Sequence, residues 1–427
     1  QSDVLCCAFL PSGALVSGAA DGAMLVWRGG KVAARVRAHA SECRVLAWAA
    51  DGAELLSGGG DGKVLVWAAA ALEGVGQQAA EGSAAAAAAA PKRELSVGGG
   101  ARRSAVRGVA SEASGGGVLV GTAGCDVVRL LGGEKEEMLV DGHTADLYGV
   151  AGSPVDGRLF ATACDSAKVK LWDAEARRAL QEVGVKAAAR CVGFSPDGSQ
   201  LAVGLVDGSV EVVALPRLGS GGGGGGGDEK LTVRLHDSRR AVSCVGWSPD
   251  GQTLAVGTAE GAIDLYDTAK WSRLARCRGH ASVVAQLDWS RDSALVQSNC
   301  QAYEVLYWEG RSGRQVRAPQ REYAQWAGWS CKLGWPVMGI WREGFDGTDV
   351  NAVHASDDGS LVVVADDKGG VCLYRFPCVA ARAPCYRAAG HSSHVTNVRW
   401  LLGGARCVPV GGPDRAVLPG KLGQWEA

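Results

Sequence analysis

The sequence predicts an all-β protein whose four-stranded units repeat around a ring, which is the architecture of a β-propeller. Three observations lead to this prediction. Tryptophan is unusually common for an aromatic residue, with 14 Trp beside 7 Tyr and 5 Phe. Short apolar runs are bounded by Gly, Pro, Asp and Ser, which is typical of strands joined by tight turns. This arrangement recurs about every forty residues, which is the spacing of one propeller blade.

The stretch 141–173 shows one complete unit of this repeat. It opens with Gly142-His143 and continues with two apolar runs, at residues 147–151 and 159–163, which a turn containing Pro and Asp-Gly separates. It closes on Trp172, which Asp173 follows. A Gly-His near the start and a Trp-Asp near the end of a four-stranded unit are typical of the WD40 repeat.

The same layout recurs along the whole chain. Trp27 and Trp67 are 40 residues apart, and Tyr266 and Trp308 are 42 residues apart, which fits the same repeat. The longer intervals are explained by low-complexity inserts, which we expect to protrude from loops. The aligned third-strand positions are Trp27, Trp67, a degenerate site near Leu130, Trp172, Val213, Tyr266, Trp308, Tyr374 and Trp425.

Nine units are more than the four to eight blades with which propellers usually close. We therefore expect an atypical WD40 β-propeller of seven or eight blades, closed by a strand contributed from earlier in the chain. The surplus, one blade or a few strands, is expected to belong to a preceding propeller. Val4–Phe9 is predicted to be a first strand. The last blade is predicted to be irregular, because Pro413 and Pro419 interrupt it, and to lack a fourth strand, because its third-strand position is Trp425, near the end of the sequence.

Composition shifts divide the chain further, because runs of alanine and glycine cannot build a packed core. The predicted division is residues 1–67 for the opening WD40 units, the first of which belongs to a preceding propeller, 68–100 for a low-complexity insert, and 101–427 for the remaining blades, with a Gly-rich loop insert at 216–228 and an atypical blade at 326–387.

The recurring His, Thr, Asp and Trp are predicted to be structural pins of the blades. A buried Trp needs a hydrogen-bond partner for its indole N–H, and a His at the start of the blade, a Ser or Thr in the second strand and an Asp in the next turn can supply one. Catalysis is the alternative for His and Asp together, but such His residues recur at the starts of several blades. The predicted pins are His143, Thr162, Asp165 and Trp172 in one blade, and His280, Trp308 and His391 in others.

Composition and motifs argue against several functional classes. A net charge of −1 gives no overall positive field for a phosphate backbone, and no run of 18 large apolar residues occurs, so neither nucleic acid nor membrane is expected as a partner. The 14 Cys show no C-x-x-C spacing, so we expect buried, reduced thiols and no metal site. No P-loop, G-x-S-x-G or H-E-x-x-H motif occurs, and Asp366-Asp367 lies at a predicted turn. We therefore expect no enzyme activity and no cofactor.

Residues 326–400 carry a more specific signal than the WD40 repeats. The segment combines a Trp-rich stretch at 326–341 with Glu343–Val353, Ala365–Val371, Tyr374–Cys378 and Gly390–Val398. In this combination it closely resembles the C-terminal end of the echinoderm microtubule-associated-protein-like (EMAP-like) family. Shorter stretches look like the same family in the same order, so the resemblance covers essentially the whole chain; they are Cys6–Leu10, Leu56–Asp61 and Leu287–Ser290.

This resemblance implies a function as well as a fold. Members of the family carry a tandem pair of atypical propellers, and this chain looks like the second propeller with its approach. The family's hydrophobic signature motif and its N-terminal coiled coil with a basic linker are not found here. The resemblance implies a non-catalytic cytoskeletal module whose partners are tubulin, microtubules or microtubule-associated proteins, in the cytoplasm and cytoskeleton and in the axoneme of the cilium or flagellum.

Basic loops are the candidate partner contacts, because tubulin surfaces are acidic. The candidates are Arg102 and Arg103 with Arg107, Arg239 and Arg240 beside His236, and Lys92-Arg93. The alternative for each cluster is a solvated loop charge without a partner. For the chain as a whole, the alternative is a general WD40 scaffold for protein–protein interactions that makes no tubulin contact.

Overall fold

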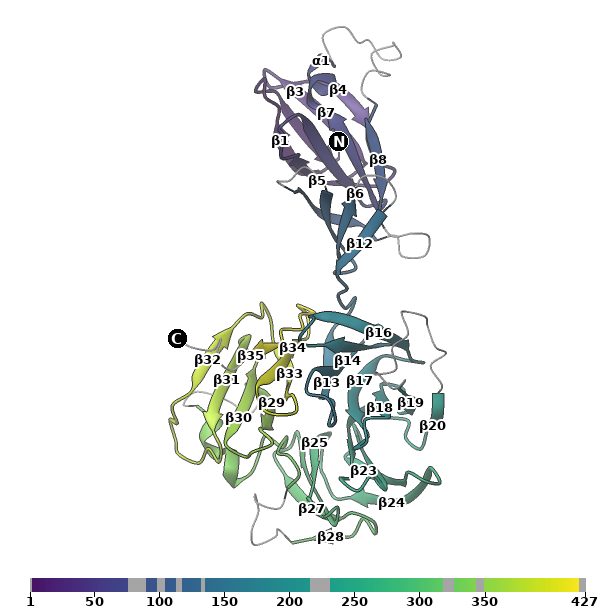
Figure 1. The fold of residues 1–427 in the computed structure, drawn as a ribbon, viewed down its shortest axis with the longest axis vertical. Coiled ribbons are helices and arrows are strands. Elements are labelled where there is room, and N and C mark those ends of the chain that lie inside the picture. The colour runs from purple at the N-terminus through teal and green to yellow at the C-terminus, as the bar shows by residue number, and fades with distance from the viewer. Residues whose placement is uncertain are drawn as a thin grey trace. The chain divides into compact units, whose positions relative to one another are not determined.

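The computed structural model describes residues 2–75, 90–97, 104–112, 117–131, 135–215, 231–317, 326–342 and 349–421. The chain divides into two compact units, Gln1–Thr144 and Ala145–Ala427, each of which is built from antiparallel sheets (Figure 1). The all-β prediction is therefore confirmed. No helix in the part of the chain that the structure describes has the length and apolar character needed to cross a membrane.

The first unit contains three four-stranded sheets, and the middle sheet packs against the other two. Their strands are β1 (Val4–Phe9), β2 (Leu15–Ala19), β3 (Ala23–Arg28) and β4 (Lys31–Arg37), then β5 (Cys43–Trp48), β6 (Glu54–Gly59), β7 (Lys63–Ala68) and β8 (Arg93–Ser96), then β9 (Val106–Ser111), β10 (Gly117–Thr122), β11 (Val127–Leu131) and β12 (Lys135–Val140). The short helix α1 (Ala69–Gly74) follows β7.

The second unit contains five four-stranded sheets and a last sheet of three strands. In chain order the strands are β13 (Leu147–Gly152), β14 (Leu159–Cys164), β15 (Lys168–Asp173), β16 (Arg178–Gly184); β17 (Ala189–Phe194), β18 (Gln200–Leu205), β19 (Val210–Ala214), β20 (Leu231–Leu235); β21 (Val242–Trp247), β22 (Thr253–Thr258), β23 (Ala262–Asp267), β24 (Ser272–Arg278); β25 (Val284–Trp289), β26 (Leu295–Cys300), β27 (Val305–Glu309), β28 (Gln315–Val316); β29 (Val350–Ala355), β30 (Leu361–Asp366), β31 (Gly370–Arg375), β32 (Tyr386–Ala389); and β33 (Val395–Trp400), β34 (Arg406–Gly411), β35 (Gly420–Lys421).

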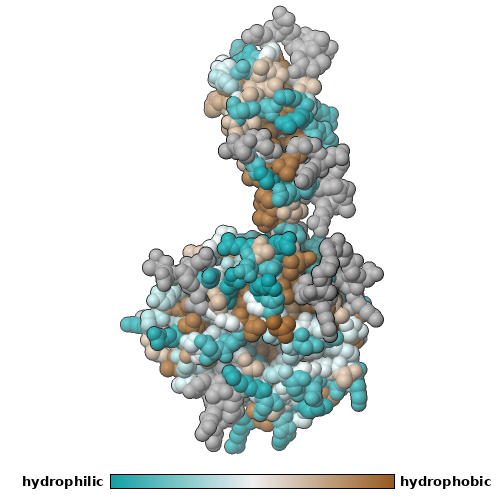
Figure 2. Space-filling view, viewed as in Figure 1, coloured by the Kyte–Doolittle hydropathy of each residue, from teal (hydrophilic) through white to brown (hydrophobic). Residues whose placement is uncertain are grey.

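These sheets form a closed ring. The first strands β13, β17, β21, β25, β29 and β33 surround a central space, and the fourth strands lie on the outside (Figure 1). The last sheet returns to the first, because Thr396 Oγ1 donates to the Leu147 carbonyl at 2.6 Å and Asn397 Nδ2 donates to the Tyr148 carbonyl at 2.9 Å. Figure 2 shows apolar residues near the middle of this unit and mostly hydrophilic residues along its lower rim.

Small residues allow the sheets to stack closely. Every residue of β22 is buried, and so are most residues of the other second strands, because they pack between neighbouring sheets. A side chain at Gly204 would place its Cβ only 2.4 Å from Cys191 Sγ and 2.5 Å from Val242 Cγ1. Leu-Ala-Val-Gly, which occurs at 201–204 and 254–257, is therefore a second-strand sequence whose glycine is required by close approach.

The structure corrects the expected blade count. Six sheets close the ring in the described residues, not seven or eight, and three sheets rather than one surplus blade lie in the first unit. No strand from earlier in the chain pairs with the last sheet within the described residues. Counting repeats gives the number of blades, but the place of closure depends on contacts between distant strands that the repeat does not encode. As predicted, the last blade is irregular, since β35 has two residues.

The predicted boundaries also change. The expected insert 68–100 contains helix α1 and strand β8, and β8 completes the second sheet by pairing with β7. Residues 84–89 of the Ala run 84–90 lie outside the described residues, and so do the Gly-rich insert 216–228 and Trp425. The atypical blade runs to Ala389, the end of β32, rather than to residue 387.

The segment 326–342 enters the ring between two sheets. The Ala327 amide donates to the Trp289 carbonyl at the end of β25, at 2.8 Å, and the Ala355 amide at the end of β29 donates to the Trp329 carbonyl at 3.0 Å. A short 3-10 turn, η3 (Trp335–Ile340), follows. This segment therefore joins the sheets β25–β28 and β29–β32. The blade is atypical because the segment is inserted between these two sheets.

Candidate functional site

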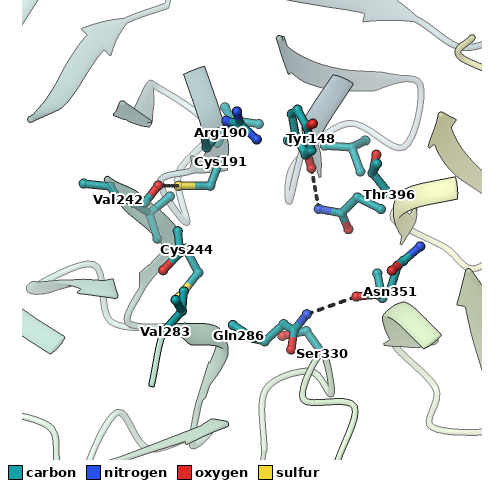
Figure 3. Close-up of a pocket in the computed structure, with 18 of the residues that line it drawn as sticks. Tyr148, Arg190, Cys191, Val242, Cys244, Val283, Gln286, Ser330, Asn351 and Thr396 are labelled. Carbon is teal, nitrogen blue, oxygen red and sulfur yellow. Dashed lines mark hydrogen bonds between the residues drawn. The ribbon is translucent and has the colours of Figure 1, made fainter. Parts of the chain in front are cut away.

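A cavity of about 660 Å³ opens at the centre of the second unit. Its wall comes from the beginnings of the six first strands and from the turns between second and third strands, so it lies at one end of the ring (Figure 3). We call this end the cavity mouth. A channel of this kind follows from the ring itself, because each first strand contributes alternate side chains to the centre.

An arginine stacked on a tyrosine forms one side of the mouth. The Arg190 guanidinium lies 3.9 Å from the centre of the Tyr148 ring (Figure 3). Its Nη2 donates to Asp165 Oδ2 at 2.9 Å. Burial raises the pKa of the Asp165 carboxyl, and Arg190 opposes this shift. The cation therefore has a fixed position that joins β13 to β17.

Amide side chains link the first strands β25, β29 and β33. Gln286 Nε2 on β25 donates to the Asn351 carbonyl at 3.3 Å, and Asn351 Nδ2 on β29 donates to the Val395 carbonyl at 3.0 Å and to Asp367 Oδ1 at 2.6 Å. Asn397 continues this pattern from β33 to β13. Each link uses one side-chain amide, so these residues fix the spacing of the strands around the cavity.

A buried carboxylate anchors the inserted segment beneath the cavity. Asp288 on β25 accepts hydrogen bonds from the amides of Ser330 and Cys331 at 2.9 to 3.0 Å and from Gln297 Nε2 at 3.0 Å. Nearby, Lys332 Nζ donates to the Val350 carbonyl at 2.8 Å, and burial lowers the pKa of this ammonium. These groups are engaged in holding the chain, and the described wall offers no nucleophile paired with a base.

His354 gives the ring a pH dependence that can be measured. Its Nδ1 accepts a hydrogen bond from the Trp400 amide at 3.0 Å, and burial together with nearby Arg399 lowers its pKa to about 3. The pKa of His in an unfolded chain is about 6.5, so below that pH the unfolded chain binds more protons than the folded chain. The stabilisation from neutral His354 is complete above pH 6.5 and is lost as the pH falls.

The free energy of unfolding should fall between pH 7 and pH 5 in the wild type. We expect this fall to be smaller in His354→Gln by about 1–2 kcal/mol. Urea unfolding at the two pH values measures this difference. His236→Gln, which removes an exposed His, is the control and should leave the loss as in the wild type. If the free energy of unfolding falls equally in the wild type and in His354→Gln, the pH dependence does not come from His354.

Two of the predicted partner-binding arginines lie at the cavity mouth. Arg239 and Arg240 are exposed on the loop before β21, and the next residue, Ala241, lines the cavity. The Ser238 hydroxyl donates to the Arg240 carbonyl at 3.1 Å and accepts from the Arg240 amide at 3.0 Å. Gly208, at φ +88°, lies so close that a Cβ would be 2.2 Å from the Ser238 carbonyl oxygen. The loop is therefore held in place while its guanidinium groups face solvent.

The other basic candidates are placed differently. Arg102 and Arg103 lie outside the described residues, and Arg107 is exposed on β9. Lys92 and Arg93 both form ion pairs with Glu54, at 2.5 and 3.1 Å. Their charges are partly compensated within the first unit, so Arg239 and Arg240 remain the strongest described candidates.

Three of the four residues predicted to form one pin make side-chain hydrogen bonds, namely Thr162, Asp165 and Trp172. Trp172 Nε1 donates to Thr162 Oγ1 at 2.7 Å, whereas Asp165 accepts from Arg190 of the next blade. His143 is buried within the range of the first unit, and Thr162, Asp165 and Trp172 belong to the second. Their role as pins stays a prediction, which the Trp308 substitution discussed below would test.

Two further predicted histidines have polar partners, and His280 is joined through a serine to a tryptophan. His280 Nε2 lies 2.7 Å from Ser298 Oγ, which also accepts from Trp308 Nε1 at 2.8 Å. His391 Nδ1 lies 2.9 Å from Asp414 Oδ2, which accepts from the Ser392 amide as well. Burial lowers the pKa of His280, which favours its neutral form and suits a hydrogen-bonding role.

The sequence analysis expected a Ser or Thr of the second strand at this position but named only Thr162, and it left the corresponding serines of the other blades unnamed. Ser57 lies 2.9 Å from both His39 Nε2 and Trp67 Nε1, and Ser17 accepts from Trp27. A spacing rule could have found them, because each acceptor precedes its Trp by ten residues. The pairs are Ser17–Trp27, Ser57–Trp67, Thr162–Trp172 and Ser298–Trp308.

One cluster in the described residues has the donor set of a metal site. Ligand atoms of His280, Cys300 and Glu304 lie within 4.8 Å of one another. They are already engaged, because Cys300 Sγ donates to Glu304 Oε2 at 3.3 Å and the Ala281 amide donates to the same oxygen at 2.9 Å. All 14 cysteines are free thiols, and most are buried. The cluster thus fits a blade pin better than a metal centre.

Comparison with known proteins adds an independent finding. Residues 147–426 match the family described as echinoderm microtubule-associated protein second beta-propeller, and residues 1–28 and 30–68 match the WD domain, G-beta repeat. The first match coincides closely with the second structural unit.

Individual proteins that are similar to this chain carry the name of the same family. Echinoderm microtubule-associated protein-like 2 of Rattus norvegicus is 38% identical over 294 residues, covering 67% of this chain and 42% of the relative. The human like 3 protein and the Mus musculus like 1 protein are each 34% identical over 327 residues, covering 75% of this chain and 34% and 38% of those relatives. The chain thus spans less than half the length of these curated relatives.

Proposed function

Since this chain belongs to the echinoderm microtubule-associated protein-like family, we propose that it is a non-catalytic module that attaches to microtubules through its closed ring. The observation that carries the proposal is the match over 147–426, because it spans the whole second unit rather than isolated WD repeats. The names of the relatives describe microtubule association, and none of the contacts around the cavity suggests catalysis.

The cavity mouth is the face that we assign to the partner. Arg239 and Arg240 are exposed there on a loop held by Ser238, and Arg190 is stacked on Tyr148 beside it. Acidic protein surfaces such as those of tubulin attract fixed positive groups, and exposed contacts of this kind mainly raise the association rate and set its salt dependence. A net charge near zero does not prevent this, because the local charge decides the contact.

Replacing both arginines tests the assignment. The double variant Arg239→Ala, Arg240→Ala is expected to lower microtubule affinity about fivefold in co-sedimentation, since each exposed charge contributes up to about 1 kcal/mol. The matched control is Arg177→Ala, Arg178→Ala, another adjacent and exposed pair, which lies beyond the end of β15 at the opposite end of the ring. Pelleting that responds equally to the two double variants, or to neither, would remove the mouth from the proposal.

A scaffold without tubulin contact is the second candidate. It is favoured by the polar, internally paired wall of the cavity, which carries both Lys332 and Asp367 and has no single charge sign. Cross-linking in a cell extract distinguishes the candidates by the partner recovered. For the cell, we propose the cytoplasmic cytoskeleton and, more narrowly, the axoneme of the cilium; fluorescence of the tagged chain that stays away from both would contradict this placement.

A further inference from the structure

One arginine in the wall of the central cavity lies well below the mouth. Arg399 follows Asn397 by two residues on β33, so both side chains lie on the same face of the strand, and both line the cavity. Strand β33 begins at the mouth with Val395, which places Arg399 about 13 Å further along the strand. Arg399 therefore belongs to the deeper part of the cavity.

The protein engages few of the hydrogen-bond donors of Arg399. A guanidinium carries five N–H groups. Nη1 donates to the Val398 carbonyl at 2.9 Å, and no carboxylate of the described residues forms an ion pair with this side chain. Nε and Nη2 have no partner in the described part of the chain, yet protein atoms do not enclose them, so they are open to the cavity. Most of the donors are thus available to a ligand.

Other polar groups of the same wall are paired. Arg190 donates to Asp165 at 2.9 Å and stacks on a tyrosine ring. Gln286 donates to the Asn351 carbonyl (Figure 3). For Arg399, burial lowers the pKa of the guanidinium, but an arginine remains charged at neutral pH. Its charge is therefore held deep in the ring without a partner in direct contact, which is unfavourable unless an anion supplies one.

The acidic groups nearest to this region do not supply that contact. Asp288 favours the charged form of Arg399 from a distance, but its oxygens accept from the Ser330 and Cys331 amides and from a glutamine side chain. Burial raises the pKa of the Cys244 thiol to about 12 and that of Cys331 well above its usual range, so both thiols stay neutral. The negative charge here is committed to holding the inserted segment.

A second cation lines the same cavity. Lys332 uses one of its three N–H groups on the Val350 carbonyl, at 2.8 Å. Burial lowers the pKa of this ammonium, and the charge of Asp367 opposes the shift. Asp367 itself accepts from Asn351 at 2.6 Å and lies 3.0 Å from His394 Nδ1. Lys332 therefore keeps donors for a ligand, although its charge is partly offset.

The carboxylates of the wall lie at the mouth. Asp367 follows the last residue of β30, and Asp146 precedes the first residue of β13. The pKa of Asp165 is raised by burial and further by the charge of Asp146, so Asp146 lies near the pair that Asp165 forms with Arg190. The charge of the cavity thus changes with depth, from mixed signs at the mouth to an unpaired cation below it.

We propose that the deeper part of the cavity binds one carboxylate group, which comes from a small organic acid or from an acidic peptide residue that enters through the mouth. The carboxylate accepts two parallel hydrogen bonds from Arg399, because a guanidinium matches its planar geometry, and Lys332 adds positive charge. A singly charged group suits the site better than a phosphate dianion, since Asp288 and Asp367 offset part of the positive charge.

The size of the cavity agrees with such a ligand. Its volume of about 660 Å³ lies within the range of small-molecule sites. The site uses neither Arg239 nor Arg240, so it does not depend on the proposed microtubule attachment.

NMR saturation-transfer titration of the 427-residue chain with four probes tests the proposal. The probes are butyrate, a glycine pentapeptide with a central glutamate and blocked ends, the same peptide with glutamine, and inorganic phosphate. At least one of the first two is expected to bind about tenfold more tightly than the last two. Tighter binding of butyrate assigns the site to a small acid, and tighter binding of the glutamate peptide assigns it to a peptide.

Substitutions locate the binding. Arg399→Gln is expected to weaken carboxylate binding about tenfold or more, and Arg399→Lys, which keeps the charge but loses the paired donors, about threefold. The control Lys186→Gln removes a cation that pairs with Asp207 and does not line the cavity, so it should leave the affinity unchanged. Thermal unfolding shows whether each variant is folded, and Arg399→Lys decides if Arg399→Gln is not.

The two proposals fail separately. The double variant Arg239→Ala, Arg240→Ala should keep the carboxylate affinity within about twofold while it loses microtubule affinity. Carboxylate probes that bind no better than the glutamine peptide would overturn the carboxylate site, and so would wild-type affinity in a folded Arg399→Gln or, if that variant does not fold, in Arg399→Lys.

Discussion

Trp308→Ala is expected to lower the free energy of unfolding of the second unit by about 3–5 kcal/mol, the range for removing a large buried aromatic side chain. Trp308 is 1% exposed and lies in a cluster with Leu265, Val284 and Val296 from two neighbouring sheets. Its removal leaves a cavity between the sheets. It also leaves Ser298 with one partner fewer, which weakens the chain that runs to His280.

Urea unfolding followed by tryptophan fluorescence and circular dichroism measures this loss. Trp335→Ala is the matched control, since it makes the same substitution at an indole that is 44% exposed, and it should cost less than about 1 kcal/mol. A loss of the same size at both positions would mean that Trp308 does not hold neighbouring sheets together. Ser298→Ala should fall between the two, because it removes the hydrogen bonds but little volume.

Asp288→Ala is expected to be comparably severe, with a loss of about 3–5 kcal/mol. The buried carboxylate accepts from Ser330, Cys331 and Gln297, so its removal leaves three buried donors without this acceptor. It also removes the negative charge that favours the charged form of the half-buried Arg399. Because two of the donors are backbone amides of the inserted segment, the loss should first appear there.

Hydrogen exchange measures that local effect, and denaturant unfolding measures the total. Amides between 326 and 342 should lose protection in Asp288→Ala, whereas those of β17 and β18 should keep it until the ring unfolds. The control Asp250→Ala removes an exposed turn carboxylate that accepts from Ser248 and Gln252, and it should cost about 1 kcal/mol or less. Unchanged protection of the inserted segment would show that Asp288 does not anchor it.

Periodic features of the fold could be predicted from the sequence. Trp27, Trp67, Trp172 and Trp308 all lie on third strands, as their spacing indicates, and Val4–Phe9 is a first strand. Such features repeat because each blade solves the same packing problem with the same residue types. Local patterns therefore carry enough information to place them.

Features that depend on distant contacts could not be predicted. The ring closes where Thr396 and Asn397 of β33 donate to carbonyls of β13, about 250 residues away in sequence, and a count of repeats does not reveal which blades meet. The role of Asp288 could not be predicted, because its acceptor function depends on a segment about forty residues further along the chain that packs against it only in the folded structure. Strand β8 could not be predicted, because an alanine-rich stretch separates it from β7 in the sequence. The fourth strand of this blade therefore does not follow the third at the usual spacing.

Co-sedimentation of the unmodified chain with microtubules, at increasing microtubule and salt concentrations, tests the proposed attachment most directly. The chain should pellet to saturation at low ionic strength and return to solution as salt screens the arginines of the mouth. A chain that stays in the supernatant at every microtubule concentration in low salt would contradict the proposed function.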